Sequence, residues 1–214
     1  AGTAEADGEV LLHCTTVEGN CKIAKLAVAT TSGFSLTVDA EGNVYVGTNE
    51  GVWSFTADGA QRWSTSGINV TERGSFAING NVLYAALKKT DGVAAIDMAT
   101  GEVKWKTSKG SNDSYFPTIG PDGTIYYTSK GDKKVYAYNP DGTLKWETEA
   151  IAALIYTNVV VTKDGKLYTG TQANVGDTGS KQLLTIDAAT GSLITMEPSD
   201  QIMSAFTFGP DARV

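Results

Sequence analysis

The sequence is poor in the side chains on which many catalytic and metal sites are built. Among 214 residues it has one histidine, His13, and two cysteines, Cys14 and Cys21. One histidine and two cysteines at this spacing match no common zinc site, and a histidine-activated nucleophile would have to use His13. His13 falls in an expected strand, where a partly buried side chain is the simpler interpretation. This scarcity argues against an enzyme that depends on histidine, cysteine or zinc.

The sequence also lacks a long apolar run and an excess of positive charge. No stretch approaches the roughly 20 apolar residues of a membrane-spanning helix. Residues 1–8 are small and acidic, without the basic start and apolar centre of a signal peptide. The formal net charge is −7, which argues against general nucleic-acid binding, because Lys and Arg must neutralise the phosphates. We therefore expect no nucleic-acid partner and no membrane span.

Glycine is abundant, with 24 residues against five prolines, and it marks a repeat. Five glycines each close an expected strand–turn–strand, at spacings of 40, 42, 41 and 49 residues: Gly19, Gly59, Gly101, Gly142 and Gly191. In the last four units an earlier turn, with Glu, Asn or Asp before glycine, precedes a strand that carries tyrosine. Upstream of each such turn lies another short apolar strand. A four-stranded unit of about 40 residues is typical of a propeller blade.

The sequence thus predicts an all-β fold, a β-propeller of four-stranded antiparallel blades in a single domain over residues 1–214. Four blades are expected at residues 32–70, 71–110, 111–150 and 151–200. A fifth, closing blade is expected from both termini, residues 1–31 and 201–214. Residues 204–211 resemble the entry to a unit, residues 9–15 and 21–26 its third and fourth strands, and residues 1–6 are the candidate second strand. The alternative is a fragment of a larger propeller.

The pattern Ala-x-Asp-x-x-Thr-Gly-x-x-x-Trp, complete at residues 95–105, resembles the tryptophan-docking repeat of the quinoprotein, or PQQ-like, family. Partial copies end at Trp63 and Trp146, whereas Thr195 replaces the tryptophan in the last unit. The resemblance implies that Trp63, Trp105 and Trp146 are structural and dock between adjacent blades. The family includes quinone-dependent dehydrogenases and non-enzymatic propellers, among them a periplasmic scaffold of outer-membrane assembly and bacterial surface proteins.

The residues that quinone catalysis would need are not gathered in this sequence. The resemblance implies that a dehydrogenase of this family clamps an anionic cofactor with arginines, holds calcium and carries adjacent cysteines. Here the three arginines, Arg62, Arg73 and Arg213, are scattered, and the cysteines lie seven residues apart. The Asp-Gly and Glu-Gly pairs are better explained as turns than as metal loops. We expect no catalytic residue, cofactor or metal; the alternative is an enzyme with a quinone or another cofactor in the central channel.

The two cysteines bear on the compartment. Cys14 and Cys21 lie symmetrically about an expected turn at residues 17–20, so they would face each other across a hairpin at near-disulfide distance. We expect a disulfide, which implies an oxidising compartment; the alternative is two buried free thiols. The expected location is extracytoplasmic, in the periplasm or at the cell surface.

The loops between the second and third strands of the blades are the candidate ligand-binding surface. These loops share one face of a propeller, and loops on a rigid scaffold commonly carry function. The loop at residues 171–181 is an insertion that accounts for the spacing of 49, although an insertion is also tolerated without function. The candidate loop residues are Lys88, Lys133, Gln172, Asn174 and Asp177. We expect a non-catalytic binding or scaffold module for a protein or glycan; the sequence predicts no oligomeric state.

Overall fold

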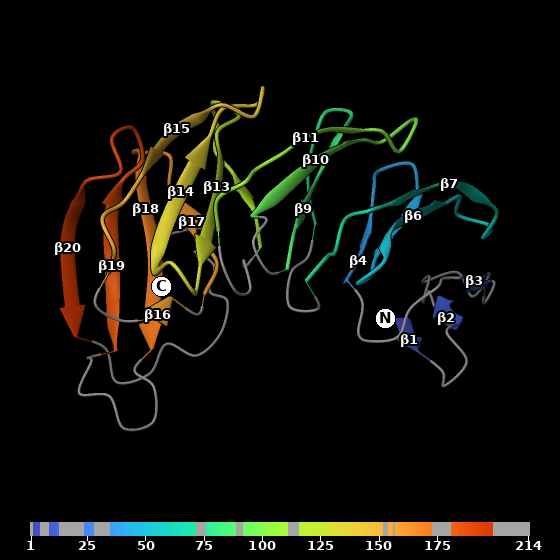
Figure 1. Ribbon diagram of the computed structural model, residues 1–214, viewed down its shortest axis with the longest axis horizontal. Coiled ribbons are helices and arrows are strands. Elements are labelled where there is room, and N and C mark those ends of the chain that lie inside the picture. Colours follow the sequence, from blue (N-terminus) through green and yellow to red (C-terminus); the bar gives the residue numbers. More distant parts are fainter. Residues whose placement is uncertain are drawn as a thin grey trace.

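The structure is a computed structural model, and it describes residues 2–4, 9–12, 24–27, 35–71, 76–88, 92–110, 116–151, 154–155, 157–172 and 181–198. Every regular element in these residues is a β-strand, and all strand pairs are antiparallel. Figure 1 shows the sheets following one another along an arc in chain order. No helix of the described residues is long and apolar enough to cross a membrane.

Three of the sheets have four strands in the order of the chain. The first consists of β4 (Ser35–Val38), β5 (Val44–Gly47), β6 (Gly51–Phe55) and β7 (Gln61–Ser66). The second consists of β8 (Phe76–Asn79), β9 (Val82–Ala86), β10 (Val93–Asp97) and β11 (Val103–Lys106). The third consists of β12 (Thr118–Ile119), β13 (Ile125–Ser129), β14 (Lys134–Tyr138) and β15 (Leu144–Glu147). The prediction of four-stranded antiparallel units is confirmed.

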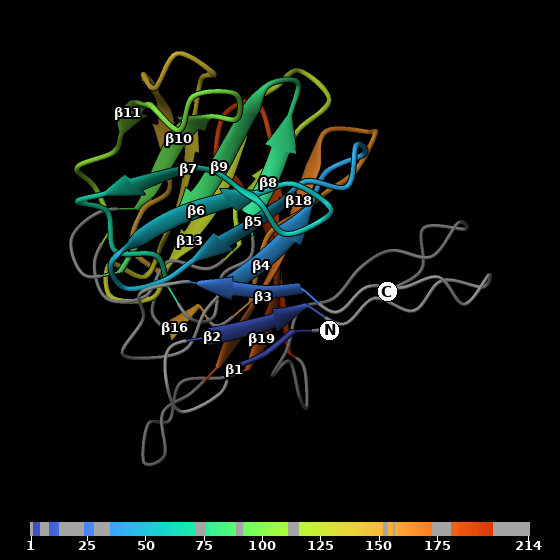
Figure 2. The same cartoon turned by 90° about the vertical axis from the view of Figure 1, so that its right-hand side faces the viewer.

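The fourth sheet has an inner strand in two short pieces, which both pair with the long β18. Its strands are β16 (Leu154–Ile155), β17 (Val160–Val161), β18 (Lys166–Gln172), β19 (Gln182–Asp187) and β20 (Leu193–Pro198). At the N-terminal end of the arc, β1 (Gly2–Ala4), β2 (Glu9–Leu12) and β3 (Ala24–Ala27) form a separate sheet (Figure 2). Here β1 pairs with β2 as the expected second strand. Residues 201–214, expected to close a fifth blade, lie outside the described residues, so five blades stay a prediction.

The core lies between neighbouring sheets from β4 to β20, where apolar side chains of one sheet pack against those of the next. The inner strands β4, β8, β12 and β17 contact one another in turn. Central strands such as β5 and β13 are buried along their whole length, because both of their faces are covered; such strands are apolar without alternation. The outer strand β11 instead alternates between half-buried and exposed residues. This stacking brings the outer strand of one sheet against a turn of the next.

Candidate functional site

A tryptophan on the outer strand of the first four-stranded sheet lies against a turn of the second. The Nε1–H group of Trp63 donates a hydrogen bond of 2.9 Å to the backbone oxygen of Met98. A Cβ atom at Gly101 would lie 2.6 Å from Cε3 of this ring, so the ring and the turn approach this closely only because residue 101 is glycine. The φ of Gly101 is +79°, a conformation that also favours glycine.

The same arrangement recurs at the next two junctions. Trp105 donates a hydrogen bond of 3.0 Å to the backbone oxygen of Pro140, and its ring lies against Gly142. Trp146 donates a hydrogen bond of 3.0 Å to the backbone oxygen of Ala188, and its ring lies against Gly191. Trp63 and Trp146 are 8% and 9% exposed, whereas Trp105 is half-buried. Each ring therefore lies at a different junction, and the three do not surround a common pocket. Their contribution to stability stays a prediction.

The fourth sheet departs from this arrangement. Thr195 stands where the other sheets carry tryptophan, since it pairs with Thr185 as Trp146 pairs with Ala137. The whole of β20 is exposed, including the large apolar side chains of Leu193, Ile194 and Met196. Its outer strand thus differs in chemistry from those of the first three sheets.

The described loop candidates lie at one end of three successive sheets, beside the links between second and third strands. Lys88 follows β9, Lys133 lies between β13 and β14, and Gln172 ends β18. Lys133 has a φ of +58°, a left-handed conformation that is uncommon for a residue with a side chain and occurs in tight turns and at strained sites. Each candidate belongs to a different sheet. Asn174 and Asp177 lie outside the described residues, as do His13, Cys14 and Cys21.

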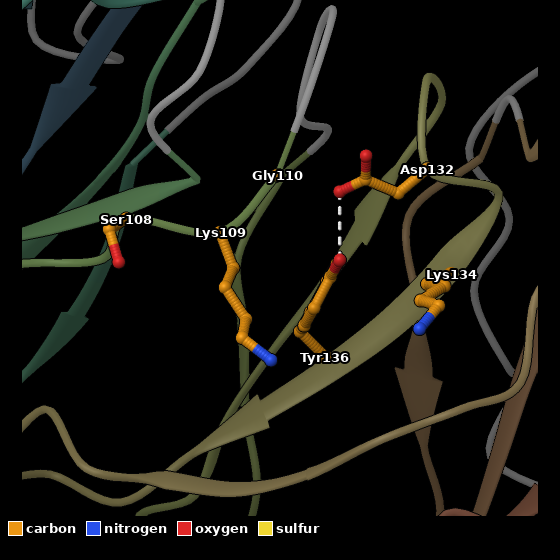
Figure 3. A pocket seen from close by; sticks show the side chains of 6 residues that line it. All are labelled: Ser108, Lys109, Gly110, Asp132, Lys134 and Tyr136. Carbon is orange, nitrogen blue, oxygen red and sulfur yellow. Dashed lines mark hydrogen bonds between the residues drawn. The ribbon is translucent and has the colours of Figure 1, made fainter.

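Beside Lys133, a surface depression of about 470 Å³ joins the second and third sheets. We call it the loop depression; it is lined by Ser108, Lys109, Gly110, Asp132, Lys134 and Tyr136 (Figure 3). The first three residues follow β11 of the second sheet, and the others come from the loop and strand β14 of the third. The depression therefore crosses a junction between two repeats.

Charged side chains from both sheets meet at this depression. The Nζ of Lys134 lies 2.7 Å from one carboxylate oxygen of Glu147, and the Nζ of Lys109 contacts the other. These two ammonium groups hold the pKa of Glu147 below its usual range, Lys109 contributing most, and Glu147 in turn raises the pKa of Lys109. Two positive charges thus share one carboxylate. Lys133 was a candidate from the sequence and lies in the chain between Asp132 and Lys134 of this depression, whereas Lys109 and Glu147 were not among the candidates.

A tyrosine forms the floor of the loop depression. The hydroxyl of Tyr136 donates a hydrogen bond of 2.8 Å to Oδ2 of Asp132 (Figure 3). The pKa of Tyr136 is raised mainly by burial and, to a smaller extent, by this carboxylate. Only 4% of Tyr136 is exposed, and its ring stacks on Tyr127 at 5.2 Å between centroids. The floor is therefore a buried, stacked ring with a hydrogen-bonded hydroxyl, and the rim is polar and charged.

The opposite ends of the sheets carry the Asp-Gly turns. A depression of about 400 Å³ between the third and fourth sheets is lined there by residues that include Asp122, Lys145 and Asp187. The ammonium group of Lys145, 2.9 Å from Asp122, is the main cause that lowers the pKa of Asp122 to about 2. Asp187 accepts from the backbone N–H of Ala189, as expected of a turn residue. Among the described residues, no three His, Cys, Asp or Glu side chains are placed to hold one metal ion.

Comparisons with known proteins agree on the fold. No curated protein matches the chain by sequence. The chain superimposes on the computationally designed Ika8 protein with a TM-score of 0.71 at 14% identity, covering 97% of this chain and 62% of that one. For BamB from Moraxella catarrhalis the TM-score is 0.69 at 17% identity, covering 98% of this chain and 64% of that one. The chain therefore spans less than two thirds of the length of both structures.

The designed Ika4 protein is also similar, with a TM-score of 0.51 at 15% identity over 63% of this chain and 78% of that one. Together with the repeated docking of tryptophan on glycine, these likenesses confirm a propeller of PQQ-like repeats. The family model described as "Outer membrane protein assembly factor BamB" matches residues 48–202. That match covers more than half of the sequence, and the chain belongs to this family.

Proposed function

We propose that this chain is a non-catalytic scaffold that binds a protein partner outside the cytoplasm. The support is its family, whose model is named for an outer membrane protein assembly factor. An assembly factor acts by holding other proteins, and the propeller provides a rigid body for loops that do so.

The loop depression is the proposed binding surface for this partner. The observation that carries it is the sharing of Glu147 between Lys109 and Lys134, which fixes residues of two repeats in one charged surface. Charged side chains at a rim guide association and set specificity more than they add affinity. Gly110, with a φ of +118°, lines the same surface without a side chain.

A protein partner fits this surface better than a glycan. Among the described residues that line the loop depression the aromatic one is Tyr136, and its ring is stacked on Tyr127 and almost fully buried. It therefore offers no open aromatic face to a sugar ring. The polar rim of Ser108, Lys109 and Lys134 instead suits carboxylates and backbone carbonyls of a polypeptide.

Site-directed photocrosslinking tests this proposal. The chain is exported to the periplasm of a Gram-negative bacterium with a photoreactive residue in place of Lys133 at the loop depression. A matched variant carries it at Asp58, an exposed residue of the turn at the other end of the first sheet. We expect a discrete protein adduct, identified by mass spectrometry as an outer-membrane assembly component, from position 133 only. Equal adducts from both positions, or no protein adduct from position 133, would contradict the proposal.

A further inference from the structure

The outer strand of the fourth sheet has an open edge. All six residues of β20, Leu193–Pro198, are exposed, and β20 pairs with β19 along one side. Within the described part of the chain no strand pairs with its other side, which faces away from the arc in Figure 1. Such an edge presents unpaired backbone N–H and C=O groups to an incoming strand.

Three of the four outer strands carry a cation at their β-bulge, and β20 does not. Each outer strand has a one-residue β-bulge against the strand before it. The bulged residue is Arg62 in β7, Lys104 in β11 and Lys145 in β15, but in β20 it is Ile194, which is 49% exposed. Charged side chains at edges are a common device against strand addition. In β20 an exposed apolar residue takes the place of this cation, so no charge at the bulge opposes an incoming strand.

An apolar depression lies directly beside this edge. It has a volume of about 370 Å³ between the third and fourth sheets, and Leu193 and Met196 of β20 form one side of it. Ile151 and Ile186, both buried, lie among its other lining residues. Such a space accepts an apolar side chain. We call it the rim depression, and it is separate from the loop depression.

The charges around the rim depression are negative. Of the described residues that line it, none is Lys, Arg or His, whereas Glu147 and Glu149 are among them. Glu147 is already engaged by two lysines, but Glu149 is exposed, as is Glu197 of β20. An occupant with an apolar side chain and a neighbouring basic residue would complement this surface.

We propose that the β20 edge binds an extended segment of a partner protein, which adds as a strand to the fourth sheet. Backbone hydrogen bonds to β20 supply affinity, an apolar side chain of the segment fills the rim depression, and a basic side chain meets Glu149 or Glu197. A second copy of the chain is a poorer occupant. A six-residue edge alone offers too little area for a stable dimer, which needs on the order of 1,000 Å² or more.

Fluorescence anisotropy with a defined probe tests this proposal on the purified chain. The probe is a labelled ten-residue peptide that alternates valine and threonine, with a central leucine and a lysine at each end. We expect saturable binding, and we expect Ile194→Lys to weaken it at least about tenfold, a change of about 1.4 kcal/mol. The matched variant Gln61→Lys, on the exposed start of β7, should change binding less than about twofold.

Two further tests separate the contribution of backbone pairing from that of side-chain packing and charge. The peptide methylated on alternate backbone nitrogens should fail to bind, because it cannot donate along one edge. The double variant Leu193→Ala, Met196→Ala should weaken binding without a change in charge, with circular dichroism showing that it remains folded. Equal binding of the methylated peptide, or no saturation by about 1 mM peptide, would overturn the proposal. The proposal would also be overturned if the peptide did not bind and the chain self-associated in a way that Ile194→Lys abolishes. The edge would then bind a second copy of the chain.

Discussion

Removing the indole of Trp146 should destabilise the junction between the third and fourth sheets strongly. The ring is 9% exposed and packs in one cluster with Tyr126, Leu184 and Ile186. Truncating a buried tryptophan to alanine costs about 3–5 kcal/mol of unfolding free energy, because transfer energy is lost and a cavity remains. We therefore expect Trp146→Ala to lower the unfolding free energy by about 4 kcal/mol, a large part of the stability of a typical domain.

The structure also predicts a ranking among the tryptophans. Trp105 is half-buried, so Trp105→Ala should cost about half as much, about 2 kcal/mol. Trp146→Phe keeps most of the apolar contact and removes one of two donors to the backbone oxygen of Ala188, to which the Tyr126 hydroxyl also donates. We expect a cost of about 0.5–1.5 kcal/mol, the net contribution of one hydrogen bond. Thr195→Ala, at the equivalent exposed position of the fourth sheet, should stay within about 0.5 kcal/mol of the parent.

Urea unfolding followed by circular dichroism measures all four variants. Since repeats stabilise one another through nearest-neighbour contacts, the loss should fall on the junction that contains the substituted ring. A change below about 1 kcal/mol for Trp146→Ala would refute the reasoning. A larger effect for Trp105→Ala than for Trp146→Ala would show that burial between sheets is not what these rings contribute.

Three further outcomes are expected. Gly142→Ala should destabilise more than Gly165→Ala: both glycines have positive φ, but only at Gly142 would a Cβ press into a tryptophan ring, at 2.7 Å. Thermal unfolding would show no difference if the contact did not matter. The low pKa of Asp122 should add stability that is present above pH 4 and lost as the pH falls towards 2, and Asp122→Asn should remove this dependence; because Asp122 is half-exposed, the effect should be below about 1 kcal/mol. Free-thiol titration of the unfolded, unreduced protein should find Cys14 and Cys21 unreactive, whereas two reactive thiols would remove the argument for an oxidising compartment.

The repeat was predictable from sequence because its constraints are local. The spacing of Gly101 from Trp105 identifies a turn and the strand after it, and tyrosine strands recur with the same period. The tryptophan and the glycine that contact each other lie in neighbouring repeats, as Trp63 and Gly101 do. Here the family resemblance implied docking between blades, which spacing alone does not give.

The loop depression was only partly predictable. Lys133 was a candidate because it lies in a loop between second and third strands, and its chain neighbours Asp132 and Lys134 line the depression. Lys109 and Glu147, in contrast, are 38 residues apart and belong to different repeats. Each is an ordinary exposed charge when it is considered alone in the sequence. Their meeting depends on how far one sheet is rotated against the next, and no residue pattern encodes that rotation directly.

The outer edge of the fourth sheet shows how a repeat can carry information through its exceptions. The sequence shows Thr195 as a missing tryptophan, but it does not distinguish Ile194, because isoleucine is common in strands. Only the pairing register places Ile194 at the bulge where the other outer strands carry Arg62, Lys104 and Lys145. In β20, Thr195 thus replaces the tryptophan that docks on a neighbouring sheet, and Ile194 replaces the cation at the bulge. Loss of the ring alone would weaken a junction, whereas loss of the cation removes a charge that an incoming strand would meet, and their coincidence on β20 favours a binding role for that strand.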